Sequence, residues 1–459
     1  MAGKSFRVTM RKRRTSGGTK EKFTRKTNVN AKTNAKTRTN TKAKTKTPTA
    51  EMRARHKQQM KKVSDEAAAV IALKTICADS GVCIAFGYAQ DKIKKYFNHF
   101  LDFRLVKSSR RIGEVSVNGF VFELAYKRKH YTSYAVLKNS ANQSADNLVY
   151  EYVVGKYIDL EYSKYFPCLI ETYGLFRYTN VQAYENAKQT SKLDFKSLLH
   201  IPERNGAVID VDTFKWSCID SRQHCILTQH LKGVISLGDV MSGKARLKNE
   251  MEIVYILFQV YYFLFHVRKE FTHYDLHEGN VLLFEPEKGK KIKYKYKLSD
   301  GKPMSFESAY VVKIIDYGRC HIKMSEKFYK TLGMYCNPNQ INSQGYPWFN
   351  KPGMYHINAL EPNVSHDLRL YSRVKTSNAF PALQTMKPCI YTCEFGTSEI
   401  QTNNKYPQYI GNITDCLNEL TTTIQQNSKG SIKTQNTIHL AHIQVSGDAP
   451  MRIRYLKAE

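Results

Sequence analysis

The stretch HYDLHEGNVL, residues His273–Leu282, decides the fold that we expect. It follows Glu250–Lys269, where apolar residues recur with the spacing of a helix buried along one face. Its polar residues Asp275 and Asn280 stand between that helix and a short apolar strand expected at Val281–Phe284. A carboxylate and an amide held between two buried elements suggest a site that carries out chemistry.

Two further strings share this character. The apolar run Val311–Ile315 ends in Asp316-Tyr317-Gly318, which places a carboxylate at a strand end. Upstream, Tyr134-Ala135-Val136-Leu137 forms a strand that ends in Lys138, and the helix expected at Asn147–Ile158 offers Glu151. Phosphoryl transfer needs such a set: a carboxylate for the attacking hydroxyl, oxygens for Mg²⁺, and an oriented cation on the phosphates.

Taken in order, these residues resemble the protein-kinase family. The resemblance implies that Lys138 binds the ATP phosphates and that Glu151 orients it. It implies that Asp275 is the catalytic base, and that Asn280 and Asp316 hold Mg²⁺ on the nucleotide. His273 corresponds to the first residue of the H-R-D motif, and Asp367 to the buried aspartate that begins a large helix. The expected cofactors are therefore ATP and Mg²⁺.

The resemblance extends to the nucleotide pocket and covers roughly Ile112–Tyr371. Residues 226–231, read as Ile-Leu-Thr-Gln-His-Leu, resemble the strand that runs into the adenine-binding hinge. The implied cofactor-binding residues, besides Lys138, Asn280 and Asp316, are Ser116, Gly119, Val121, Thr228, Gln229 and Leu231.

Several short strings of the sequence resemble those of kinase-like proteins of giant, large double-stranded DNA viruses. The strings that carry this likeness are Asp79–Gly87, Asn118–Val121, Asn147–Tyr152 and Tyr310–Gly318. The resemblance implies a viral serine/threonine kinase whose substrate is a protein hydroxyl. It also implies an intracellular location, in the host cytoplasm, the nucleus or the virion.

We therefore expect an α+β, two-lobed kinase-like fold behind a disordered basic tail. The tail covers residues 1–63, the β-rich lobe with a helical N-terminal extension covers 64–231, and the α-rich lobe covers 232–459. Thr179–Gln223 is a long polar insertion. Gly289–Tyr310, with Asp300-Gly301 at its centre, predicts an enlarged hairpin. Met451–Leu456 is strand-like but has no place in this scheme.

Departures from the family pattern leave alternatives open. Glu114 and Ser116 stand at two positions where the phosphate-binding loop has glycine, which favours a pseudokinase that acts as a scaffold. Tyr274 replaces the arginine that pairs with a phosphorylated activation loop, so we expect activity without such phosphorylation. His277 replaces a lysine, and D-L-H-x-x-N also resembles small-molecule phosphotransferases of the aminoglycoside type.

A metal cluster is a further alternative. His273, Asp275 and His277 offer three ligands, but a catalytic zinc site would need a further His or Glu set at strand ends. We find none placed convincingly in the sequence.

Charge is concentrated at the N-terminus. Residues 1–62 contain 21 Lys and Arg against Glu21 and Glu51, so this segment carries +19 of the total +31. Its Lys/Thr/Asn composition cannot bury enough apolar surface to fold. We expect nonspecific contact with nucleic acid or another polyanion through residues 1–62, with Arg11–Arg14 as a candidate import signal, or else a solvated tail.

The remaining composition limits the cellular setting. The ten cysteines include no C-x-x-C pair, so we expect reduced, mostly buried thiols and no zinc ribbon. No apolar run reaches the roughly 18 residues of a membrane span. The segment Met1–Lys20 has no apolar core of a signal peptide, so we expect neither secretion nor membrane insertion.

Overall fold

The computed structural model describes residues 50–77, 81–83, 88–113, 115, 119–140, 148–202, 223–323, 362–391, 408–430 and 437–456. The chain divides into two compact units, Met1–Gln59 and Met60–Glu459, and the features below belong to the second. The disordered tail is predicted at residues 1–63. Residues 1–49 lie outside the described part, but residues 50–63 belong to a helix, so the prediction is wrong there: Ala, Met, Arg, Lys and Gln favour a helix even where they bury no core. Helix α1, Ala50–Ile76, begins well before Asp65, where the sequence first shows helical spacing.

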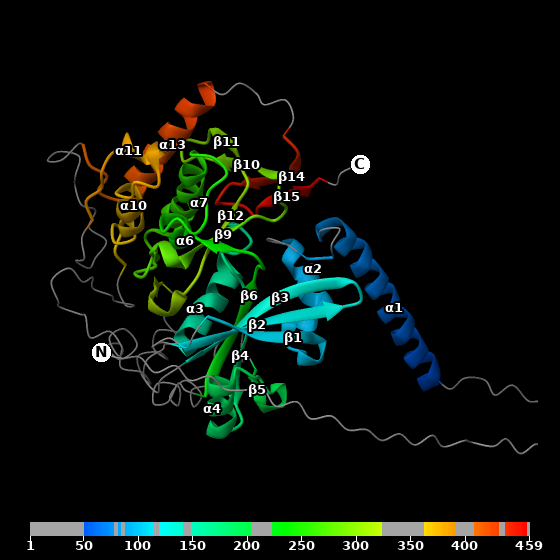
Figure 1. Ribbon diagram of the computed structural model, residues 1–459. Coiled ribbons are helices and arrows are strands. Elements are labelled where there is room, and N and C mark those ends of the chain that lie inside the picture. The colour runs from blue at the N-terminus through cyan, green and yellow to red at the C-terminus, as the bar shows by residue number, and fades with distance from the viewer. Residues whose placement is uncertain are drawn as a thin grey trace, which may run out of the picture. The chain divides into compact units, whose positions relative to one another are not determined.

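The largest sheet has six strands in the order β1-β2-β3-β6-β4-β5, and every neighbouring pair is antiparallel (Figure 1). The expected strands at Tyr134–Leu137 and residues 226–231 are present as two of these six strands. The bounds of the six are β1 Val106–Ile112, β2 Gly119–Arg128, β3 Tyr131–Ser140, β4 Thr172–Tyr178, β5 Leu198–Ile201 and β6 His224–His230. The predicted insertion supplies β5 and helix α4, Val181–Thr190.

One face of this sheet carries a continuous apolar cluster with α1 and α2, Tyr88–Tyr96. Phe100 stacks on Tyr173 with ring centroids 4.2 Å apart, and Tyr126 donates its hydroxyl to the Phe100 carbonyl at 2.7 Å. Helix α3, Leu148–Glu161, packs on β4. A Cβ at Gly155 would lie 2.1 Å from Thr172 Oγ1, so only glycine permits this approach.

A second apolar cluster surrounds α7, Glu252–Val267, which is buried along nearly its whole length. Helix α13, Ile413–Gly430, packs against α7. Short elements complete this region: β7 Ile235–Ser236, α6 Leu237–Met241, β8 Phe271–Thr272, β9 Val281–Phe284, β12 Val311–Ile314, β13 His321–Ile322, α10 Leu368–Lys375 and α11 Pro381–Gln384.

The predicted hairpin at Gly289–Tyr310 consists of β10, Lys291–Lys297, and β11, Pro303–Ser308, in antiparallel register. Strand β10 also pairs in parallel with β14, His439–Val445, which pairs with β15, Arg452–Tyr455. The predicted hairpin and the segment Met451–Leu456, which had no place in the expected scheme, therefore belong to one sheet. Its strand order is β11-β10-β14-β15 (Figure 1). Its inner face packs on α7, with Tyr262 and Tyr296 ring centroids 4.7 Å apart.

The fold is thus mixed α+β, as expected. The expectation of wholly reduced thiols is wrong for one pair: Cys77 and Cys83 form a disulfide, with Cα atoms 4.0 Å apart. The turn at Gly81 brings the two cysteines together, and the Cys83 amide is fixed by the Thr132 carbonyl at 2.9 Å. Five other cysteines in the described part are free thiols. No helix of this part is long and apolar enough to cross a membrane.

A cluster of buried charges links β4 and β12. Lys313 is only 2% exposed and donates to the Leu169 carbonyl at 2.7 Å. Burial lowers the pKa of Lys313 to about 8 and raises the pKa of the nearby Glu171 carboxyl. Glu171 in turn lies 3.2 Å from Lys94 Nζ.

Replacing Lys313 by methionine should change how stability depends on pH. In the unfolded chain a lysine titrates near its ordinary 10.5, and in the folded chain Lys313 titrates near 8. Between these values the unfolded state binds more protons, so this lysine makes stability rise with pH. Chemical denaturation across that window should show wild type gaining about 3 kcal/mol relative to Lys313→Met. Parallel stability curves for the two proteins would contradict this account.

Candidate functional site

Lys138 lies where three distant segments meet. It stands near the end of β3, directly opposite Val121 of β2. Its Nζ lies 2.7 Å from Glu151 Oε2, in the first turn of α3, and 3.0 Å from Asp316 Oδ1, after β12. One ammonium therefore bridges two carboxylates. The resemblance implies that Glu151 orients Lys138, whereas the contact of Lys138 with Asp316 is not among the predictions.

Asp316 adopts an unusual backbone conformation. Its φ is 70° and its ψ is 67°, the left-handed region that residues with a Cβ adopt at a cost of about 1–3 kcal/mol. Burial alone would raise the pKa of the Asp316 carboxyl, but the Lys138 ammonium, helped by Arg319, lowers it to about 2. The carboxylate is therefore ionised at neutral pH, which a metal ligand requires.

The loop that contains Asp275 and Asn280 is fastened to the strand that leads to Asp316. Asn280 Nδ2 donates to the Asp275 carbonyl at 2.9 Å, and the Ile315 amide donates to the Asn280 carbonyl at 3.1 Å. His273 Nε2 contacts the Ile315 carbonyl at 3.0 Å. These bonds bring the two loops together. They also direct the Asn280 amide nitrogen at the backbone, so its Oδ1 is the atom that suits a metal.

The Asp367 carboxylate supports the loop that contains Asp275 by accepting two of its backbone hydrogen bonds. Its Oδ2 accepts from the His273 amide at 2.7 Å, and its Oδ1 accepts from the Tyr274 amide at 3.1 Å. Tyr274 has a φ of 58°, so the turn before Asp275 is strained and needs this support. The Asp367 carbonyl accepts from the buried Tyr261 hydroxyl at 2.8 Å. Asp367 also precedes α10, but that helix has only 8 residues, shorter than expected.

Tyr274, which stands where kinases have arginine, lies in the core. Its side chain is fully buried, and its ring packs edge-on against His366 with centroids 5.0 Å apart. A cation comes instead from Arg319, whose Nη1 lies 3.1 Å from Asp275 Oδ2. The two side chains are only 10% and 8% exposed. Sequence reasoning missed Arg319, although its position immediately after Asp-Tyr-Gly was a usable signal.

The predicted nucleotide residues divide between the two faces of the large sheet. Cross-strand pairing puts Val121 opposite Lys138, and Thr228 opposite Val136, which lies two residues before Lys138. Because side chains alternate along a strand, Val121, Lys138 and Thr228 share one face. Gln229 pairs with Ala135 on the other face, so only its backbone is available to the first.

The positions of the three remaining predicted nucleotide-binding residues, Gly119, Leu231 and Ser116, can be stated briefly. Gly119 begins β2 opposite Ser140. Leu231 is buried just beyond the end of β6. Ser116 lies outside the described residues, as does Glu114.

The structure gives His277 a local role. Its Nδ1 accepts from the Gly279 amide at 3.0 Å, and burial lowers the pKa of the imidazole, so the ring is neutral at pH 7. Across the described ranges, no three His, Cys, Asp or Glu side chains are grouped so that they could hold a metal ion. The remaining donor set, one amide oxygen and one carboxylate, suits Mg²⁺ that is also bound by phosphate oxygens.

No protein-family model matches this chain, and no curated protein matches it with significant similarity.

Replacing Asp367 by alanine should destabilise the fold through the Asp275 loop. Two buried amides, of His273 and Tyr274, would lose their acceptor, and each such loss costs about 1–3 kcal/mol. Denaturant unfolding should therefore show a loss of about 2–6 kcal/mol for Asp367→Ala. Asp367→Asn keeps one acceptor oxygen and should lose roughly half as much. Equal stability of wild type and Asp367→Ala would show that the carboxylate does not support the loop.

Proposed function

We propose that the protein is an ATP-dependent phosphotransferase with a two-lobed kinase-like architecture, and that its acceptor is a serine or threonine hydroxyl of a protein. The observation that carries the proposal is the position of Lys138 Nζ, 2.7 Å from Glu151 Oε2 and 3.0 Å from Asp316 Oδ1. A partly buried lysine between two acids costs desolvation energy. A phosphate-binding role explains why these three side chains are held together.

The residues divide the chemical work among them. Asn280 and Asp316 would hold Mg²⁺, which supplies positive charge to the β- and γ-phosphates when it is bound. Lys138, oriented by Glu151, binds the phosphates, while Val121 and Thr228 on the same sheet face contact the nucleoside. Asp275 orients the acceptor hydroxyl and takes its proton as the oxygen attacks the γ-phosphorus of ATP; the bond from that phosphorus to the β–γ bridging oxygen breaks, and ADP leaves.

Arg319 fits this scheme as a positioning group. Its guanidinium Nη1 lies 3.1 Å from Asp275 Oδ2 in a nearly dry environment, and this ion pair fixes the rotamer of the carboxylate. Tyr274 cannot take that part because its ring lies in the core. Arg319 lies three residues after Asp316 in the same turn. The proposed base Asp275 and the proposed metal ligand Asp316 would therefore be oriented together.

Two other functions have support from particular residues. A small-molecule acceptor of the aminoglycoside type is favoured by His277, which is neutral and brings no cation to the γ-phosphate. A pseudokinase scaffold is favoured by Glu114 and Ser116 in place of glycine. The retained set of Lys138, Asp275, Asn280 and Asp316 favours catalysis over a scaffold.

Asp275→Asn should abolish most phosphate transfer while Mg-ATP still binds. Loss of a general base lowers turnover by about 10²- to 10⁴-fold. Transfer of labelled phosphate to a generic protein, to the chain itself and to an aminoglycoside measures this and identifies the acceptor class. Asp300→Asn, in the exposed β10–β11 turn, is the matched control and should match wild type. Equal transfer by wild type and Asp275→Asn would refute the proposal.

Lys138→Met should weaken Mg-ATP binding as well as transfer. A charge-assisted bond contributes about 1.5–3 kcal/mol, so the dissociation constant should rise roughly ten- to hundredfold. Calorimetric titration of Mg-ATP into the variant measures the change. Lys127→Met removes an exposed lysine of the same sheet and should bind as wild type does. A wild-type protein that binds no Mg-ATP at all would instead be a pseudokinase.

A further inference from the structure

The β11-β10-β14-β15 sheet has one apolar face and one cationic face. Along β10, Ile292, Tyr294 and Tyr296 are buried toward α7, while the alternating lysines point outward. The outward residues of the four strands include four lysines, two arginines and a single carboxylate. They are Lys291, Lys293, Lys295, Lys297, Pro303, Ser305, Glu307, His439, His442, Gln444, Arg452 and Arg454.

Strand register gathers the cations from both hairpins. One row across the sheet runs Lys293, His442, Arg454, and the next runs Lys295, Gln444, Arg452. Neighbouring strands lie about 4.8 Å apart, and alternate residues of one strand about 6.6 Å apart. Lys295, Lys297 and Arg452 also line one hollow of about 660 Å³.

This arrangement is unfavourable for folding by itself. Like charges on adjacent strands repel. Burial and then the positive charges of His439, Lys293 and Arg454 lower the pKa of His442, as expected of a ring within a cationic surface. Repetition of lysine at every second residue of β10 therefore calls for an anionic partner.

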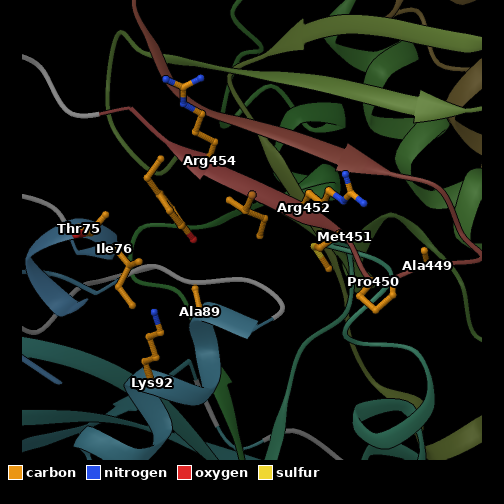
Figure 2. Close-up of a pocket in the computed structure, with 11 residues that line it drawn as sticks. Thr75, Ile76, Ala89, Lys92, Ala449, Pro450, Met451, Arg452 and Arg454 are labelled. Atoms are coloured by element: carbon orange, nitrogen blue, oxygen red, sulfur yellow. The ribbon is translucent and has the colours of Figure 1, made fainter. Parts of the chain in front are cut away.

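Among the described residues, protein carboxylates neutralise only part of this face. Glu307 Oε1 lies 2.8 Å from His439 Nε2, and Asp448 Oδ2 lies 2.8 Å from Lys297 Nζ. In the part of the chain that the structure describes, Lys293, Lys295, Arg452 and Arg454 form no ion pair. Figure 2 shows the Arg454 side chain extending away from Ile76 and Lys92, which line a pocket beside β15 together with Arg452 and Arg454 themselves. The cation is thus directed outward.

We propose that this face, defined by Lys293, Lys295, Arg452 and Arg454, binds the sugar-phosphate backbone of double-stranded nucleic acid. Regular rows of cations suit a regular row of phosphates, and each neutralised phosphate releases counterions. The outward residues of the four strands include no Phe, Tyr or Trp, so the face has no platform for stacking unpaired bases. Binding is therefore insensitive to sequence. It is independent of phosphotransfer and adds a folded contact to the basic tail.

The test uses the full-length chain and the combined variant Lys293→Thr, Lys295→Thr, Arg452→Thr, Arg454→Thr. Threonine keeps strand propensity at exposed positions. Fluorescence anisotropy with a short duplex of arbitrary sequence, between about 50 and 200 mM salt, gives the dependence of affinity on salt. Loss of four phosphate contacts should reduce the slope of log K against log salt by about 3 to 4.

Matched controls separate this face from total charge. The combined variant Lys107→Thr, Lys127→Thr, Lys192→Thr, Lys196→Thr removes the same charge from exposed sites elsewhere and should keep the wild-type slope. Lys293→Arg with Lys295→Arg keeps the charge and should also bind as wild type. Both sets are compared by thermal melting to confirm folding. Equal slopes for the two four-site variants would overturn the proposal. The proposal would also be overturned if the variant Lys293→Thr, Lys295→Thr, Arg452→Thr, Arg454→Thr lost binding to phosphatidylserine vesicles but bound the duplex as wild type does. The partner of this face would then be a membrane.

Discussion

The Lys138 ammonium between Glu151 and Asp316 is the interaction on which the arrangement of the site depends. It joins strand β3, helix α3 and the turn after β12, which belong to segments far apart in the chain. Each partner carries a cost that the others offset: Lys138 and Glu151 are mostly desolvated, and Asp316 holds a left-handed backbone. Removing Lys138 would leave two carboxylates, Glu151 and Asp316, without the cation that they share.

The same logic extends to the neighbouring loop. Asp367 satisfies the amides of His273 and Tyr274, Asn280 bonds the Asp275 carbonyl, and Arg319 binds the Asp275 carboxylate. Each strained or charged group is thus held by a residue from another element. Such over-determination lets a structure keep unfavourable conformations at a site, and it accounts for the strain at Tyr274 and Asp316 together.

Most of the secondary structure and the pairing of Lys138 with Glu151 could be predicted, because period and residue type express them locally. The place of Arg319 directly after Asp316-Tyr317-Gly318 assigns it to the site, but its pairing with Asp275 could not be predicted because that partner lies on another loop. The pairing of β10 with β14 was equally hidden: parallel pairing between strands so distant leaves no local mark. The Cys77–Cys83 bridge depends on the tight turn at Gly81, which spacing alone does not reveal.

The lysine-rich sheet β11-β10-β14-β15 shows where part of the chain's net positive charge lies. Residues 1–62 hold +19, which left +12 on residues 63–459 with no assigned place. Part of it lies on one ordered face, where backbone pairing fixes the spacing between cations. A tail and a sheet differ physically as polyanion ligands. A segment that is disordered when free, as the sequence predicts for the tail, would pay ordering entropy when it binds, whereas β10 and β15 present their side chains on a preformed surface. Linking the two raises the effective concentration of each for the same duplex. A chain with both elements would keep its proposed catalytic site beside nucleic acid even where either contact alone is weak.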